Sequence, residues 1–403
     1  SPVQIMNTSV DKQFDGKFSV ENRYDFLNLN TCRFLWKQVK FPTATDASNT
    51  TAQVLKQGEV QGSDVAAHSA GVLDIKTTIL PDADALFLTA IDRYGHELWR
   101  WTFPVNKLNQ ANEVLSPLSN KVTSTETENE LTVKAKNHTF IFSKKDGQLK
   151  GVSVNNRKIS FANGPRFIGA RRADRSLDQF YNHDDEKAKE KDRTYSEFPD
   201  AAVFTKLDVK EDGGNLIVTA DYKLGNLDKV QWTINPNGEA VLDYTYNFSG
   251  VVDLMGICFD YPEDQVISKR WLGAGPYRVW QNRIHGTQYD VWENDYNDPI
   301  PGETFTYPEF KGYFGSVSWM NIRTKEGTIS LTNETPDAYI GVYQPRDGRD
   351  RLLYTLPESG ISVLNVIPPV RNKVNSTDLC GPSSQPKWVN GPQSGRIIFR
   401  FME

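Results

Sequence analysis

The feature that most restricts how this chain can fold is a short alternation of apolar and polar residues that recurs along nearly its whole length. The clearest case is "KVQWTI", then "NPNG", then "EAVLDYTYNFS", residues 229–249. Successive side chains of a strand point to opposite faces of a sheet, so each arm of this unit has one apolar face. The pattern predicts a hairpin that buries Val230, Trp232 and Ile234 from its first arm and Ala240, Leu242, Tyr244, Tyr246 and Phe248 from its second.

Strand-like segments fall into two groups, and no segment shows the period of a long amphipathic helix. The first group predicts a small β-sandwich from segments at 2–7, 16–26, 32–41, 72–80, 85–95 and 97–105. Residues 106–130 are polar and poor in large apolar side chains, so a domain boundary is expected there. The second group predicts a large two-sheet antiparallel structure from segments at 131–143, 148–156, 229–249, 315–322, 327–334, 338–345, 360–367 and 395–403.

Charge and hydropathy exclude several classes of partner. The 46 basic and 51 acidic residues give a net charge of −5 with mixed signs, which argues against a nucleic-acid or anionic-membrane surface. No run approaches the roughly 18 apolar residues of a membrane span, and the N-terminus lacks the apolar stretch of a secretory signal. Because the chain starts at Ser1-Pro2, we expect a mature product or an excised fragment.

Residue patterns that carry metal, phosphate or nucleotide chemistry are missing from the sequence. It contains no HExxH, GxSxG, Walker-type loop or GxGxxG after a strand, and its five histidines do not cluster. Cys32, Cys258 and Cys380 are far apart and are expected to be buried structural thiols. We therefore predict no metal and no cofactor, and no catalytic residue is nominated, because strand spacing cannot show which carboxylates face each other.

The charged stretch "NHDDEKAKEKDR", residues 182–193, interrupts the strand pattern. Such a run cannot bury enough apolar area to order itself, so a solvated loop is one interpretation. A loop over the mouth of a binding site is the other.

Four segments resemble, in the same order, segments of family 2 glycoside hydrolases of the β-galactosidase type. "GKFSVENRYDFLNLNTCRFLWKQVK" resembles the opening of the immunoglobulin-like domain that follows the catalytic barrel, where an Asn-x-Tyr-x-Phe strand leads to a Trp strand. "GPRFIGARRADR" and "WLGAGPYRVWQNR" resemble two segments of the last domain. "NSTDLCGPSSQPKWVNG" resembles the loop that presents a Trp to the sugar in the neighbouring barrel. The matching residues are Asn22, Tyr24, Phe26, Trp36, Trp271, Gly273, Gly275, Pro276, Trp280, Arg283 and Trp388.

The resemblance implies an all-β chain: an immunoglobulin-like β-sandwich over 1–112, followed by a galactose-mutarotase-like β-supersandwich over 113–403. It implies that both carboxylates of the retaining mechanism lie in a (β/α)8 barrel. No alternation of strand and helix periods marks such a barrel within 1–403, so this chain alone is expected to be inactive. Expected partners are a β-glycoside carbohydrate, the parent's barrel and a second copy of the chain. The expected location is periplasmic or extracellular in a bacterium.

Five residues are predicted to contact sugar: Trp388, Trp280, Arg283, Tyr277 and His285. An aromatic ring stacks on the apolar face of a pyranose, while forked donors hold its hydroxyls. Trp388 leads this set, because an indole in a Pro-, Gly- and Ser-rich loop is hard to bury. Trp271, Gly273, Gly275 and Pro276 are expected to shape a backbone corner.

Two other functions stay open. A stand-alone pair of carbohydrate-binding modules would bind glycans through Trp280 or Trp388. An aldose-epimerase-like or lyase-like enzyme would use His183 or His285 as a general base, which requires a partner beside the substrate proton. The sugar and its linkage are not determined by the sequence.

Overall fold

The computed structural model describes residues 1–46, 51–105, 121–172, 195–295, 312–342, 357, 359–369 and 381–403. The chain divides into two compact units, Ser1–Gln110 with Gln288–Val291, and Ala111–Thr287 with Trp292–Glu403. The predicted boundary at 112/113 lies outside the described residues, as do Cys380, His183 and the charged stretch 182–193.

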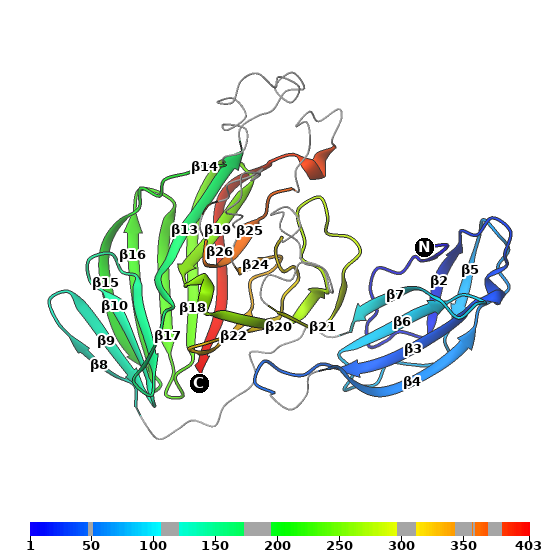
Figure 1. Ribbon diagram of the computed structural model, residues 1–403, viewed down its shortest axis with the longest axis horizontal. Coiled ribbons are helices and arrows are strands. Elements are labelled where there is room, and N and C mark those ends of the chain that lie inside the picture. Colours follow the sequence, from blue (N-terminus) through cyan, green and yellow to red (C-terminus); the bar gives the residue numbers. More distant parts are fainter. Residues whose placement is uncertain are drawn as a thin grey trace, which may run out of the picture. The chain divides into compact units, whose positions relative to one another are not determined.

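The first unit is a sandwich of two antiparallel sheets (Figure 1), as the immunoglobulin-like prediction requires. Its core lies between the sheets, where the Phe18 and Phe103 ring centroids are 5.1 Å apart. One sheet has the order β1 (Val3–Ile5), β2 (Lys17–Asn22), β5 (Ser69–Asp74). The other has the order β4 (Gln53–Gln61), β3 (Arg33–Lys40), β6 (Ala85–Ile91), β7 (Glu97–Pro104), and a 3-10 turn, η1 (Leu29–Thr31), precedes β3.

Strand β4 was not among the predicted segments. Its sequence, QVLKQGEVQ, is mostly polar and exposed, because it is an edge strand paired only with β3. Gly58 in this strand lies against the Trp36 ring, where an added Cβ would stand 2.5 Å from Cζ2 of the indole. This strand supplies backbone hydrogen bonds and a glycine surface under Trp36, so its sequence lacks the alternation of apolar residues by which strands were predicted.

The expected Asn-x-Tyr-x-Phe strand ends early, at Asn22. The fully buried Asn22 amide donates to the carbonyls of Leu27 (2.8 Å) and Val65 (2.9 Å), and its Oδ1 accepts from the amide of Tyr24. These bonds turn the chain out of the sheet, as Asn side chains do when they bond nearby backbone. Phe26 is consequently 95% exposed.

The second unit contains two large antiparallel sheets. The ten-stranded sheet contains β8 (Thr123–Glu126), β9 (Glu130–Ala135), β10 (His138–Ser143), β11 (Leu149–Val154), β12 (Arg157–Ile159), β13 (Ala162–Arg172), β14 (Tyr195–Glu197), β19 (Leu254–Asp260), β25 (Ile361–Val366) and β24 (Tyr339–Val342). The nine-stranded sheet has the order β15 (Val203–Asp212), β16 (Asn215–Lys223), β17 (Leu227–Ile234), β18 (Ala240–Val252), β26 (Lys387–Met402), β23 (Gly327–Asn333), β22 (Trp319–Thr324), β20 (Val266–Gly275), β21 (Gln288–Asp295). Two 3-10 turns are η3 (Glu263–Gln265) and η5 (Pro382–Ser384). The all-β prediction is confirmed, since the described residues contain no α-helix.

The core of this unit is one cluster that takes side chains from both sheets. Trp232 of β17 and Phe399 of β26 meet Phe259 of β19 with ring centroids 6.1 and 5.6 Å apart. The predicted hairpin is confirmed, with Ile234 opposite Ala240 and with Ala240, Leu242, Tyr244, Tyr246 and Phe248 all buried.

Residues 131–143 were predicted as one strand and form two, which is a correction. Strand β9 ends at Ala135, and His138 of β10 lies opposite it. Two residues, Lys136 and Asn137, lie between the strands, and Lys136 has φ +51°, a left-handed conformation that ends a strand.

Strand β26 is the second correction, because its first half was predicted to be a loop. From Lys387 to Arg396 it pairs with β18 in unbroken register, Lys387 opposite Val252 and Arg396 opposite Asp243. On its other side it pairs with β23 only from Ile397 onward. Pro392 lacks an amide hydrogen and is tolerated where one edge carries no ladder. The strand that bears Trp388 is therefore continuous with the core (Figure 1).

Candidate functional site

The first half of "WLGAGPYRVWQNR" is buried structure. Trp271, in the middle of β20, is fully buried, and its Nε1 donates to the carbonyl of Ala274 at 2.9 Å. A Cβ on Gly275 would stand 2.4 Å from Cδ1 of Trp292. Only glycine permits this close approach of backbone to indole.

Trp280 is buried as well, on the outer face of the ten-stranded sheet. It is 4% exposed and contacts Tyr313 edge to face at 5.6 Å, in a cluster that includes Leu254 and Cys258. Its ring has no solvent-facing side, so we drop Trp280 from the residues proposed to contact sugar. Cys32 and Cys258 are buried free thiols.

Tyr277, Arg283 and His285 lie near the surface in the turn around Trp280. Tyr277 is 46% exposed, and the amide of Arg283 donates to the carbonyl of Trp280 at 2.8 Å. His285 is exposed and has no hydrogen-bond or ion-pair partner among the described residues. An imidazole without a partner lacks the arrangement that a general base requires.

Gln281 connects this turn to the segment that precedes Trp388. Its side chain is 7% exposed, and its Nε2 donates to the carbonyls of Ser383 (2.9 Å) and Gln385 (2.7 Å). Its amide donates to Pro368. The sequence interpretation missed this role, because the two segments are about a hundred residues apart. The corner motif thus holds the segment that leads into β26.

Trp388, the second residue of β26, lies opposite Val251 and is 71% exposed. Two residues further, Asn390 Oδ1 accepts a 2.7 Å hydrogen bond from the hydroxyl of Ser249 on β18. The hydrogen-bonded ladder fixes the backbone under the indole while the ring stays uncovered. An exposed aromatic ring on a rigid strand is a surface on which a sugar can stack.

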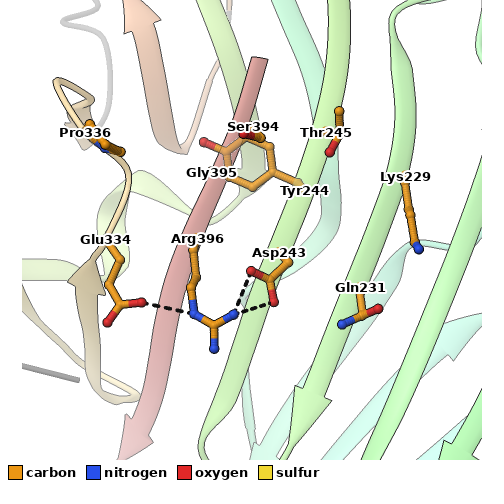
Figure 2. Close-up of a pocket in the computed structure, with 10 residues that line it drawn as sticks. All are labelled: Lys229, Gln231, Asp243, Tyr244, Thr245, Glu334, Pro336, Ser394, Gly395 and Arg396. Carbon is orange, nitrogen blue, oxygen red and sulfur yellow. Dashed lines mark hydrogen bonds and ion pairs between the residues drawn. The ribbon is translucent and has the colours of Figure 1, made fainter. Parts of the chain in front are cut away.

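Further along β26, the same sheet carries a polar hollow of about 410 Å³. Figure 2 shows Arg396 at its centre, with its guanidinium between two carboxylates. One nitrogen of Arg396 bonds both oxygens of Asp243 at 2.8 and 2.9 Å, and Nε lies 3.0 Å from Glu334. The lining residues are Lys229, Gln231, Asp243, Tyr244, Thr245, Glu334, Pro336, Ser394, Gly395 and Arg396.

Among the described residues, no group of three or more His, Cys, Asp or Glu is placed to hold a metal ion. No helix in the same ranges is long and apolar enough to cross a membrane.

Three comparisons relate this chain to known proteins. No curated protein matches the chain. Among solved structures, it is similar to a galactose 1-epimerase from Lactobacillus acidophilus at 12% sequence identity and a TM-score of 0.38. The match covers 70% of this chain and 98% of the epimerase. An aldose epimerase homologue from C. elegans is similar at 8% sequence identity and a TM-score of 0.35, and the match covers 70% of this chain and 99% of the homologue. The β-galactosidase small chain family matches residues 134–367, more than half of the 403 residues. The chain therefore belongs to the β-galactosidase small chain family.

Proposed function

We propose that this chain is the non-catalytic C-terminal portion of a family 2 glycoside hydrolase, and that Trp388 offers its indole to a sugar held by a separate catalytic barrel. The observation that carries the proposal is that Trp388 is 71% exposed on β26. Hydrogen bonds from Gln281 hold the segment that precedes this strand. The family match supports a carbohydrate setting for this ring.

The chemistry of the indole suits this role. Its π-face carries partial negative charge and packs on the C–H groups of a pyranose, while the ring keeps few internal degrees of freedom to lose on binding. Tyr277, Arg283 and His285 border the turn that holds the Trp388 segment, and we keep them as further proposed sugar contacts. Both catalytic carboxylates are assigned to the barrel. Association with a second copy and a periplasmic or extracellular location are parts of the same proposal.

Hydrolysis of nitrophenyl β-glycosides tests the proposal. Residues 1–403 should show no turnover, whereas a protein that also carries the barrel should be active. In that longer protein, Trp388→Ala should lower kcat/KM by about tenfold, equivalent to ~1.4 kcal/mol of lost stacking. Trp388→Tyr should keep most of the activity. Phe26→Ala, which removes a 95% exposed ring from the first unit, is the matched control. Turnover by residues 1–403 alone would contradict the assignment.

A stand-alone carbohydrate-binding role is the second candidate, favoured by the indole of Trp388, which is 71% exposed on this chain by itself. Glycan-array binding by residues 1–403 that is lost in Trp388→Ala would support it. A chain that binds no glycan on the array would remove it.

A further inference from the structure

The hollow around Arg396 contains polar groups that the role proposed for Trp388 does not use. We propose that it binds one ring of a neutral sugar by hydrogen bonds to its hydroxyl groups, separately from Trp388. The inference rests on the residues of the hollow alone and goes beyond the role proposed for Trp388.

Two rows of polar side chains form the hollow across three strands. Lys229, Thr245 and Ser394 are register partners in one row, on β17, β18 and β26. Gln231, Asp243 and Arg396 make the next row in the same way. Strands are about 4.8 Å apart and next-but-one residues about 7 Å apart, so the six residues cover roughly 10 by 7 Å. This area suits a single sugar ring.

The charges of the hollow disfavour an ionic ligand. Arg396 is already paired with Asp243 and Glu334, so its charge is compensated within the protein. Lys229 balances the second carboxylate, which leaves two cations and two anions in the lining. An anionic ligand would have to compete with carboxylates at 2.8 to 3.0 Å from Arg396. A neutral ligand meets no such competition.

The remaining polar groups match hydroxyls. Within the parts of the chain that the structure describes, the side chains of Gln231, Thr245 and Ser394 have no hydrogen-bond partner. An amide and two hydroxyls can each donate and accept, as the hydroxyls of a sugar can. Lys229, equally without a partner there, adds a donor. These four groups can bond a ligand without first breaking bonds within the protein.

The floor and size of the hollow fit a small ring. Gly395 lies opposite Tyr244, whose hydroxyl would stand 2.2 Å from an added Cβ, so the buried tyrosine occupies the side-chain position of residue 395. Pro336 supplies an apolar wall from the loop after β23, visible in Figure 2. The volume of about 410 Å³ lies within the range of about 300–1,000 Å³ for small-molecule sites.

Trp388 is on the same face of β26, six residues before Ser394. At about 3.3 Å per residue the two are roughly 20 Å apart, further than one sugar ring reaches. The hollow must therefore bind its ring without help from the indole.

The test is binding of simple glycosides to residues 1–403 carrying Trp388→Ala, so that the indole contributes nothing. Saturation-transfer NMR and calorimetry would compare methyl β-D-galactopyranoside and methyl β-D-glucopyranoside with the anionic methyl β-D-glucuronide. The double variant Gln231→Leu/Thr245→Val removes two hydroxyl-binding groups. Thr219→Val makes the same change one strand away, outside the hollow, and is the control. Thermal unfolding checks that each variant is folded.

We expect saturable binding of at least one neutral glycoside, weakened about tenfold or more in the double variant and unchanged in Thr219→Val. Three outcomes would overturn the proposal: no saturable binding of either neutral glycoside, equal binding by the double variant, or a preference for the glucuronide that Lys229→Met abolishes. Failure of the role proposed for Trp388 would show separately, in the kinetics of the barrel-containing protein.

Discussion

Replacing Gln281 by alanine tests whether the corner motif positions the segment before Trp388. The Gln281 side chain is 7% exposed, and its Nε2 donates hydrogen bonds of 2.9 and 2.7 Å to the carbonyls of Ser383 and Gln385. Alanine removes both bonds and leaves the carbonyls to water or unpaired. Strand β26 itself should persist, because its ladder with β18 does not involve Gln281.

The magnitude follows from the two bonds. A typical intramolecular hydrogen bond contributes about 1 kcal/mol net, so the segment 381–386 should lose about 2 kcal/mol of local stability. At about 1.4 kcal/mol per tenfold, local opening should become roughly 30 times more frequent. The global free energy of unfolding should change less, since a surface segment can open without the core.

Hydrogen exchange measures this effect directly. The amides of Ser384 and Gln385 donate to the carbonyls of Gly381 and Pro382 in η5, and they should exchange about 30 times faster in Gln281→Ala. Gln385→Ala is the matched control, because the Nε2 of Gln385 has no partner among the described residues while its carbonyl remains.

Unchanged exchange at Ser384 and Gln385 would refute the reasoning. It would mean that the Gln281 bonds exist without holding the segment. Faster exchange in Gln385→Ala as well would show that any truncation loosens η5, which removes the specific role of Gln281.

Three further predictions concern the second unit. Phe399→Ala should cost about 3–5 kcal/mol in chemical unfolding, because the fully buried ring contacts the rings of Phe161, Trp232 and Phe259; a loss below 1 kcal/mol would contradict this packing. Gly395→Ala should cost about 1–3 kcal/mol, since its Cβ would stand 2.2 Å from the Tyr244 hydroxyl, whereas Gly151→Ala, with nothing within 4 Å, should be tolerated. Burial lowers the pKa of His138, so below pH about 6.5 the imidazole takes up a proton more readily in the unfolded chain than in the folded one. The free energy of unfolding should therefore decrease as the pH is lowered. His138→Gln should reduce the dependence of the free energy of unfolding on pH, measured by chemical unfolding between pH 5 and 7. An unchanged dependence would mean that other titrating groups cause it.

The alternation of residues was sufficient to predict the class of fold and much of each sheet. In the hairpin 229–249 every predicted inward residue is buried, because a strand exposes alternate side chains to opposite faces whatever its neighbours are. The same reasoning missed β4, whose polar edge has no apolar face, and merged β9 with β10, which are separated by a two-residue turn with Lys136 in a left-handed conformation. It also assigned 387–394 to a loop, since Gly and Pro mark turns locally but are tolerated at an unpaired edge.

The candidate site depends on contacts between segments far apart in the sequence, which the pattern of residues within one strand does not predict. The Pro-, Gly- and Ser-rich surroundings of Trp388 ranked it ahead of Trp280 as a sugar contact, and its 71% exposure agrees with that order. The burial of Trp280 against Tyr313 followed only from the tertiary packing. The contact of Gln281 with Ser383 joins segments that are a hundred residues apart.

The sequence by itself determined that this protein is all-β and which side of the hairpin 229–249 is buried. The tertiary structure decided which strands are neighbours, and with it the row that brings Gln231, Asp243 and Arg396 together. The physical reason is that side-chain alternation has a period of two residues and depends only on the chain's own backbone. Strand pairing and register are set by the whole core, so a site assembled across three strands is defined only once the core has formed.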